Sequence, residues 1–140
     1  AGIPLLAACT LDILVAGVEQ RERFHRIVPM LDARRMEVYT AVYTAEGERL
    51  TDMTAKVVAP GAFAPELQAG EVLFVGGGAP KCREVLAHPN ATFLKRFPLA
   101  RNMAGLALRS FREGAFRDVA YFEPFYLKDF VATVSRKALW

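Results

Sequence analysis

Two short, unbroken apolar runs constrain the fold of this chain more than any other feature of its sequence. One forms the middle of Arg26–Asp32, and the other is Val72–Val75, which leads straight into Gly76–Gly78. Runs of this length, bounded by charged residues or glycines, predict buried strands near the centre of a sheet. Pro29 weighs against a central position for the first run, because proline lacks an N–H group and prefers edge strands or bulges.

Four further segments predict strands. The run Glu37–Thr44 is dense in β-branched and aromatic residues. Arg49–Val58 returns after a hairpin turn in which Gly47 is expected to adopt a positive φ. Together with the first apolar run, these two segments predict an antiparallel meander. Ile3–Ala8 and Ala91–Leu94 are expected to form short additional strands.

Four segments predict helices. A helix of about ten residues is expected after Thr10, which is a suitable N-cap. Pro60–Gly70 predicts a short helix with a glycine C-cap, and Pro80 predicts the start of another. Leu99–Phe111 has the clearest helical period, and Gly114 is expected to close it. The side chains expected to face inward from the first and last of these helices are Leu11, Leu14, Val15 and Val18, and Leu99, Met103, Leu106, Ala107, Ser110 and Phe111.

The order of these elements, β-α-β-β-β-α-β-α-β-α, predicts an α/β or α+β fold with a mixed β-sheet and flanking helices. The 140 residues are an ordinary length for one domain, so residues 1–140 are expected to share a single core. Since 53% of them are hydrophobic, the chain is not intrinsically disordered. Its apolar runs are much shorter than the ~20 residues of a membrane span, so no membrane span is expected.

Cys9 and Cys82 are the two cysteines, and they show no C-x-x-C spacing. A chain with a sufficient core and two cysteines does not resemble a disulfide scaffold, which favours a reducing compartment, the cytoplasm. The start Ala1-Gly2-Ile3-Pro4 has neither an initiator methionine nor the basic region of a signal peptide. We therefore expect a processed chain, a piece of a longer protein or a naturally split relative.

The net charge of +3 is unevenly distributed, because residues 1–70 sum to −2 and residues 71–140 sum to +5. Clustered Lys and Arg raise the local potential and favour an anionic partner near the second half. An ordinary solvated surface has the same composition. Composition alone leaves both interpretations open.

The sequence contains no recognisable hydrolase constellation. Ser110 and Ser135 do not stand in a G-x-S-x-G motif, and His25 and His88 lack the spacing of metal ligands. Cys82 is expected to be a small buried hydrophobe rather than a nucleophile. We therefore predict no serine, cysteine or metal hydrolase and no metal site.

The run Gly76–Gly78 is the first candidate binding site. Glycines after a strand and before a helix allow the backbone to approach a phosphate or ribose closely. Lys81 is the only nearby cation that could balance a phosphate, although a solvated residue at the start of a helix is the favoured interpretation. The same arrangement also arises as a tight turn that packs a helix on a strand, with Gly77 as the residue expected to need a positive φ.

The connection Asp32-Ala-Arg-Arg-Met-Glu-Val-Tyr39 is the second candidate site. A carboxylate at a strand end, two arginines and a carboxylate that opens the next strand could bind a charged ligand. Alternatively, the connection is a solvated hairpin with local ion pairs that contribute at most about 1 kcal/mol each.

Four motifs, in order along the chain, resemble those of the TsaB (YeaZ) family of bacterial proteins. The Asp32–Tyr39 segment is similar to that family's D-A-R-x-G-E-V-Y, and Gly2–Leu11 is similar to its G-I-P-x-x-x-V-S-T-L. Phe74–Gly78 resembles the strand-to-glycine loop, and Glu123–Lys128 resembles the E-P-x-Y-L-[RK] ending. The residues that match the two most specific motifs are Asp32, Arg34, Glu37, Tyr39, Pro124 and Tyr126.

The sequence departs from the family pattern at two positions. Cys9 stands where serine is common, and Met36 replaces the usual glycine of the turn. The resemblance implies a ribonuclease-H-like lobe of the actin-like ATPase (ASKHA) fold. It covers only the second half of the family's proteins, so the C-terminal lobe is expected here without the N-terminal lobe.

The resemblance also implies a role. TsaB-like proteins are non-catalytic accessory subunits that hold and activate the paralogue TsaD during threonylcarbamoyladenosine synthesis on transfer RNA. A TsaE-type ATPase is the further partner of the full-length protein. The resemblance leaves open whether the protein forms a homodimer. No cofactor is expected in this chain, since ATP or ADP with magnesium would bind only in a larger complex. Direct contact with transfer RNA is not expected, because aromatic and basic residues do not interleave in the second half.

Two alternatives belong to different classes. The chain could be a nucleotide-binding lobe of an actin-like ATPase or enzyme that uses Gly76–Gly78. An actin-like site closes on its nucleotide from two lobes, so one lobe is expected to bind weakly. The historical glycoprotease label of the family would imply a peptidase, and no residue pattern supports peptide cleavage.

Overall fold

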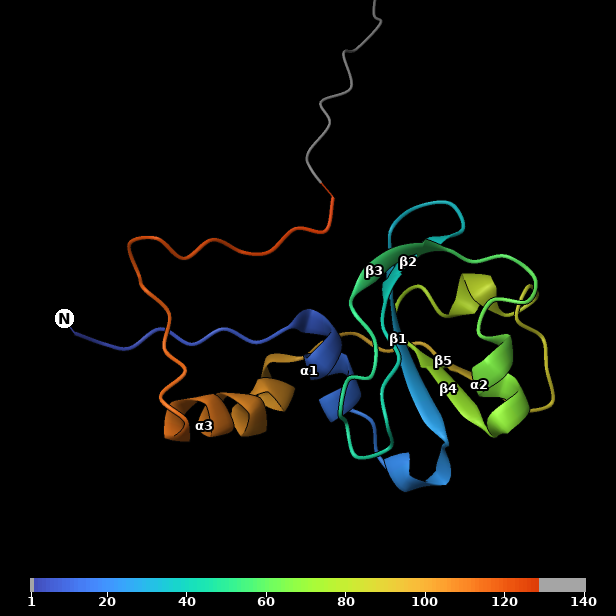
Figure 1. Cartoon of the computed structure of the whole chain (residues 1–140), viewed down its shortest axis with the longest axis horizontal. Helices are drawn as coiled ribbons and strands as arrows, with labels where there is room; N and C mark the ends of the chain where they lie inside the picture. Colours follow the sequence, from blue (N-terminus) through green and yellow to red (C-terminus); the bar gives the residue numbers. More distant parts are fainter. Residues whose placement is uncertain (1, 129–140) are drawn as a thin grey trace, which may run out of the picture.

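The two apolar runs form adjacent parallel strands at the centre of a five-stranded sheet (Figure 1). The computed structural model describes residues 2–128. The strand order is β3-β2-β1-β4-β5; the β1–β2 and β2–β3 pairs are antiparallel, whereas the β1–β4 and β4–β5 pairs are parallel. The predicted mixed sheet and its antiparallel meander are confirmed. The strands are β1 (Arg26–Asp32), β2 (Glu37–Thr40), β3 (Thr54–Val57), β4 (Val72–Val75) and β5 (Ala91–Leu94).

Pro29 lies inside β1, a central strand, despite the general preference of proline for edges. Tyr43 pairs with Ile27 through two backbone hydrogen bonds of 2.9 and 3.0 Å, and this register places Pro29 opposite Ala41. Since Pro29 has no N–H for Ala41, the ladder is interrupted there and β2 ends at Thr40. The predicted strand Glu37–Thr44 is therefore β2 followed by a single bridge.

Alternate side chains of the central strands pack into two cores, one on each face of the sheet. The helix α1 (Thr10–Ala16) covers one face, whereas α2 (Ala64–Ala69) and the 3-10 turn η2 (Pro80–Cys82) cover the other (Figure 1). The core under α1 comprises Leu11, Val15, Val18, Ile27, Ala41, Tyr43, Leu73 and Val75. The core under α2 comprises Val28, Met30, Val38, Val42, Val58, Phe63, Leu67, Val72, Phe74, Ala79, Cys82 and Leu86.

The first helix largely follows its prediction, and the side chains expected on its inner face are buried. However, Cys9 rather than Thr10 occupies the N-cap, and α1 has seven residues. The predicted helix at Pro80 is only the short turn η2, and another short turn, η1 (Arg21–Arg23), precedes β1. Gly70 ends α2 as predicted, and Gly47 has the predicted positive φ, at +94°.

The predicted strand Ile3–Ala8 is wrong. The segment runs outside the sheet and makes a single bridge, in which Leu5 O accepts a 2.9 Å hydrogen bond from Arg117 N–H. Strands β3 and β5 form the edges of the sheet, and the segment pairs with neither of them.

The last helix is formed, but its predicted inward packing is wrong. It consists of the turn η3 (Ala100–Met103) and α3 (Ala104–Arg112), and Gly114 follows with a φ of +67°. None of the residues predicted to face inward is fully buried, and the side chain of Phe111 is 53% exposed. The reason is that α1 already covers this face of the sheet; η3 contacts α1, and α3 continues beyond the sheet (Figure 1).

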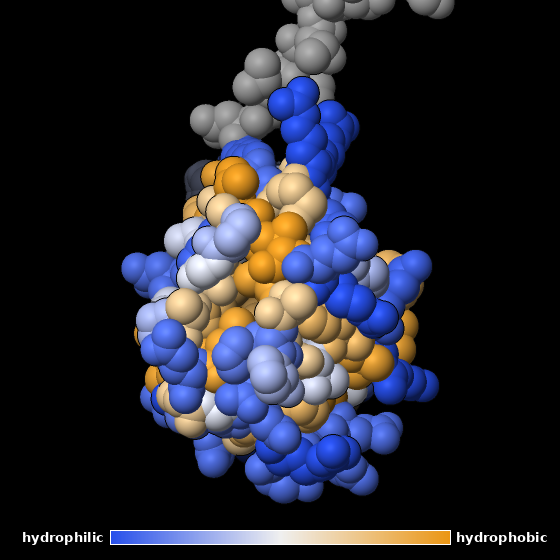
Figure 2. All heavy atoms as spheres, turned by 90° about the vertical axis from the view of Figure 1, so that its right-hand side faces the viewer, coloured by the Kyte–Doolittle hydropathy of each residue, from blue (hydrophilic) through white to orange (hydrophobic). Residues whose placement is uncertain are grey.

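The helices of residues 2–128 are all too short or too polar to cross a membrane. On the face that carries α2, hydrophobic and hydrophilic side chains share the surface, as Figure 2 shows.

Candidate functional site

The loop Gly76–Gly78 leaves β4 at the carboxyl edge of the sheet and packs against the end of β1. Gly76 has a φ of +137°, and a Cβ atom there would lie 2.2 Å from Met30 O. The Gly78 N–H donates to Met30 O at 2.9 Å, and the Gly76 N–H donates to Leu94 O at 3.0 Å. The glycines therefore allow two backbone segments to touch, which favours the tight-turn interpretation of the loop.

The expectation that Gly77 needs a positive φ is wrong, since the positive φ belongs to Gly76. A Cβ atom at Gly77 would meet only Phe97, in an ordinary contact of 3.5 Å with Cε1. The strain falls on Gly76 because β4 and β1 are paired directly before this residue.

Lys81, in η2, reaches back to the end of β1. Its Nζ atom lies 2.6 Å from Asp32 Oδ1 and donates a second hydrogen bond of 2.8 Å to Glu37 O. The Lys81 hydrogen bond, followed by one from the backbone N–H of Arg34, lowers the pKa of the Asp32 carboxyl. The structure thus brings the Gly76–Gly78 loop with Lys81 into contact with the Asp32–Tyr39 segment. The Lys81 ammonium group binds protein oxygens in this contact rather than being solvated.

Arg34 and Arg35 form the turn between β1 and β2, and both have positive φ, at +73° and +47°. Asp32 Oδ1 accepts the Arg34 N–H at 2.9 Å, which holds the turn. Met36, at the position of the family glycine, is not among the residues with positive φ. Met36 instead packs on the core under α2. The left-handed conformation is therefore adopted by Arg34 and Arg35, just before this position.

The Glu123–Lys128 tail meets the Asp32–Tyr39 segment. Lys128 Nζ forms an ion pair with Glu37 Oε2, and it lies 6.0 Å from the centre of the Tyr39 ring. Two motifs that are 91 residues apart at this contact are therefore neighbours in space.

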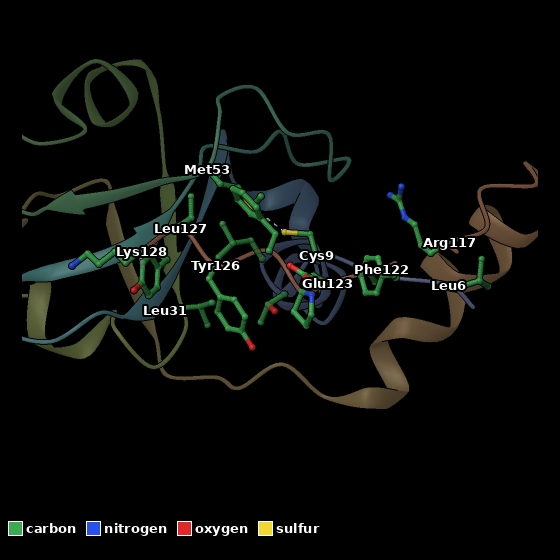
Figure 3. Close-up of a pocket in the computed structure, with 17 residues that line it drawn as sticks. Leu6, Cys9, Leu31, Met53, Arg117, Phe122, Glu123, Tyr126, Leu127 and Lys128 are labelled. Carbon is green, nitrogen blue, oxygen red and sulfur yellow. Dashed lines mark hydrogen bonds between the residues drawn. The ribbon is translucent and has the colours of Figure 1, made fainter. Parts of the chain in front are cut away.

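A pocket of about 550 Å³ lies beside this contact (Figure 3). The segment before α1 lines this pocket together with the tail, which contributes Pro124 and Tyr126. Leu31 and Tyr39 come from the sheet, and Cys9 Sγ lies 3.1 Å from Met53 Sδ. The residues of three family motifs thus surround one largely apolar pocket.

The remaining candidates do not form a site. Within residues 2–128, no group of three or more His, Cys, Asp or Glu side chains is placed to hold a metal ion. Cys82 is fully buried, and burial raises the pKa of its thiol, as expected for an inert cysteine. Ser110 lies in α3, whereas Ser135 lies outside the described residues.

Two contacts were not predicted from the sequence. The Tyr43 hydroxyl donates a 2.5 Å hydrogen bond to Asp12 Oδ1 and so joins α1 to the sheet. Burial, followed by this hydrogen bond, raises the pKa of Tyr43 well above its usual range. The second contact is the Lys128–Glu37 pair, for which the charge of the E-P-F-Y-L-K ending was the available signal.

Three antiparallel strands followed in the sheet by two parallel ones, with helices on both faces, define this protein as an α/β domain with a mixed five-stranded sheet. Comparison with solved structures shows which known proteins share this fold. The chain is similar to YeaZ from Pseudomonas aeruginosa, with a TM-score of 0.66, 22% sequence identity and 89% of this chain covered. It is also similar to an uncharacterized protein with similarity to peptidase YEAZ from Pseudomonas aeruginosa, with a TM-score of 0.72 and 23% identity over 89% of this chain.

The likeness is one of fold. This chain covers 59% of the length of each of these two neighbours. No protein-family model matches the chain, and no curated protein matches it.

Proposed function

We propose that this chain serves as the C-terminal lobe of a TsaB-like accessory subunit. In this role it supports a TsaD-type enzyme, together with a TsaE-type ATPase, in the threonylcarbamoyladenosine modification of transfer RNA. The lobe is non-catalytic, works in the cytoplasm and needs no cofactor of its own.

The observation that carries this proposal is the meeting of two motifs in a YeaZ-like fold. Asp32–Tyr39 and Glu123–Lys128 resemble the TsaB motifs, and the ion pair between Glu37 and Lys128 joins them. Residues that match a family pattern independently, and that then lie against one another, support a shared structural role.

The geometry gives less support to a nucleotide-binding enzyme. The N–H groups of Gly76 and Gly78 already donate to protein carbonyls, and Lys81 is paired with Asp32. A phosphate at this loop would have to displace these contacts before it gained an equivalent set of donors. Cys82 is also disfavoured as a peptidase nucleophile, because its thiol is buried and its pKa is raised.

Deletion of the gene that contains this sequence tests the proposal. Threonylcarbamoyladenosine in transfer RNA, measured by mass spectrometry of digested nucleosides, should fall strongly and return when the gene is restored. A restored gene that carries Lys128→Glu should rescue poorly, whereas Lys128→Glu combined with Glu37→Lys should rescue better. A normal level of the modified nucleoside in the deletion strain would contradict the proposal.

A further inference from the structure

Four arginines from separate parts of the chain line one groove of about 700 Å³. Arg21 belongs to η1, Arg49 follows the hairpin turn, Arg101 belongs to η3 and Arg109 belongs to α3. In the sequence these residues are scattered over 89 positions. The packing of η3 against α1 brings the third and fourth arginines beside the first two.

The arginines of this groove are available for a ligand. In the part of the chain that the structure describes, none of the four forms a salt bridge. Arg21 makes one long hydrogen bond, from Nη1 to Val15 O at 3.4 Å. A guanidinium without a carboxylate partner keeps its planar set of donors, which matches the oxygens of a phosphate group.

Three carboxylates share the groove, and two of them are occupied by other groups. Asp12 Oδ1 accepts the Tyr43 hydroxyl. The pKa of Glu46 is lowered first by its own backbone N–H, then by the Thr44 hydroxyl, and to a smaller extent by the positive charges of Arg26 and Arg21. Glu48 is the third, and like the other two it forms no salt bridge with the arginines within residues 2–128.

A second groove of about 370 Å³ continues the same surface. It shares Arg101 and Asn102 with the first groove and adds Arg96, Phe97 and one carboxylate, that of Glu19. The Phe97 side chain is 61% exposed, so its ring is accessible for stacking. Along this surface the fold therefore places an aromatic ring beside cations, a combination that binds nucleic-acid strands by base stacking and phosphate contacts.

We propose that these two grooves bind the phosphate backbone of RNA. The inference rests on the proposed function, in which RNA is the substrate of the complex, and it revises the expectation that this chain makes no RNA contact. That expectation considered only neighbours in the sequence, whereas the arginines converge through tertiary packing. Cations spread along an open groove suit a chain of phosphates better than a single compact anion.

The test measures binding of a fluorescently labelled transfer RNA transcript to the full chain by anisotropy at several salt concentrations. The double variant Arg101→Ala/Arg109→Ala should lower the affinity at least tenfold. It should also reduce the slope of log K against log salt by about two, because two phosphate contacts are lost. Arg49→Ala, in a different element, should reduce the slope by about one.

The matched control is Arg23→Ala/Arg83→Ala, which removes the same charge from residues outside both grooves. We expect its affinity to stay within twofold of the native chain. Equal losses in the control and the groove variant would overturn the proposal, as would the absence of RNA binding at low salt. Displacement of the RNA by millimolar inorganic phosphate, with the ionic strength held constant, would also overturn it in favour of a compact-anion site.

The outcome is separable from that of the proposed function. If the gene deletion abolishes the modified nucleoside but the groove variant binds RNA normally, only the RNA inference fails. If the deletion has no effect but the groove variant loses RNA binding, the proposed function fails and the binding site stands.

Discussion

The Nζ atom of Lys81 lies 2.6 Å from Oδ1 of Asp32, and this ion pair joins residues that are 49 positions apart. The contact exists because β1 and β4 are parallel neighbours, so that their carboxyl ends meet at one edge of the sheet. Lys128 forms the corresponding pair with Glu37 on the next strand. Two lysines thus hold both ends of the turn that carries Arg34 and Arg35.

The Lys81–Asp32 pair should make stability depend on pH in acid. Because the folded-state pKa of Asp32 is lowered, its stabilising effect is present above its ordinary pKa of 3.8 and is lost as the pH falls through the folded value. We expect Lys81→Met to reduce the free energy of unfolding by at most about 1 kcal/mol at neutral pH, since the pair is exposed. When the pH is lowered from neutral to about 2, the free energy of unfolding measured with urea should fall by less for Lys81→Met than for the native chain.

Arg83→Met is the matched control for this experiment, because Arg83 forms no salt bridge among the described residues. It should keep the native dependence on pH. If Lys81→Met and the native chain lost the same free energy on acidification, the contact would not be significant in solution.

Gly76→Ala should destabilise the domain far more than Gly77→Ala. The first substitution forces a Cβ atom to within 2.2 Å of Met30 O and adds backbone strain at a φ of +137°. We expect a loss of about 2–4 kcal/mol for Gly76→Ala and less than about 0.5 kcal/mol for Gly77→Ala. Thermal or urea unfolding measures both. Similar losses at the two positions would show that the loop is not held against β1 as described.

Tyr43→Phe should destabilise the domain by about 1.5–3 kcal/mol, because the Asp12 carboxylate loses its hydroxyl donor in a partly buried position. Tyr39→Phe provides the matched control, since no hydrogen bond of the Tyr39 hydroxyl is present within residues 2–128. We expect the control to change the free energy of unfolding by less than about 0.5 kcal/mol. Chemical denaturation of the three proteins compares them, and an unchanged stability of Tyr43→Phe would contradict this role of the hydrogen bond.

The central strands were predictable because their side chains are buried on both faces, which leaves a continuous apolar run. The same logic failed for Ile3–Ala8, where an equally apolar run lies outside the sheet. It failed again for α3, whose helical period was detected but none of whose residues is buried. The period of a segment shows only that it has an apolar side. Whether that side is buried depends on whether part of the sheet is still uncovered.

The candidate site was likewise predictable from the sequence only in part. The glycine loop and the Asp32–Tyr39 segment were identified from residue type and spacing. Their contact through Lys81 was not, because it depends on the parallel pairing of β1 with β4. The positive φ of Arg34 and Arg35 also had no sequence signal, since arginine rarely adopts this conformation.

ATP and ADP should bind this chain no more tightly than about millimolar, which corresponds to only ~4 kcal/mol. A phosphate at Gly76–Gly78 would have to compete with the protein carbonyls that accept the Gly76 and Gly78 N–H groups. It would also have to detach Lys81 from Asp32. Isothermal calorimetry with ATP and magnesium measures the affinity, with Lys81→Ala as the diagnostic variant. A dissociation constant in the low micromolar range, lost in Lys81→Ala, would overturn the accessory-subunit proposal in favour of a nucleotide-binding enzyme.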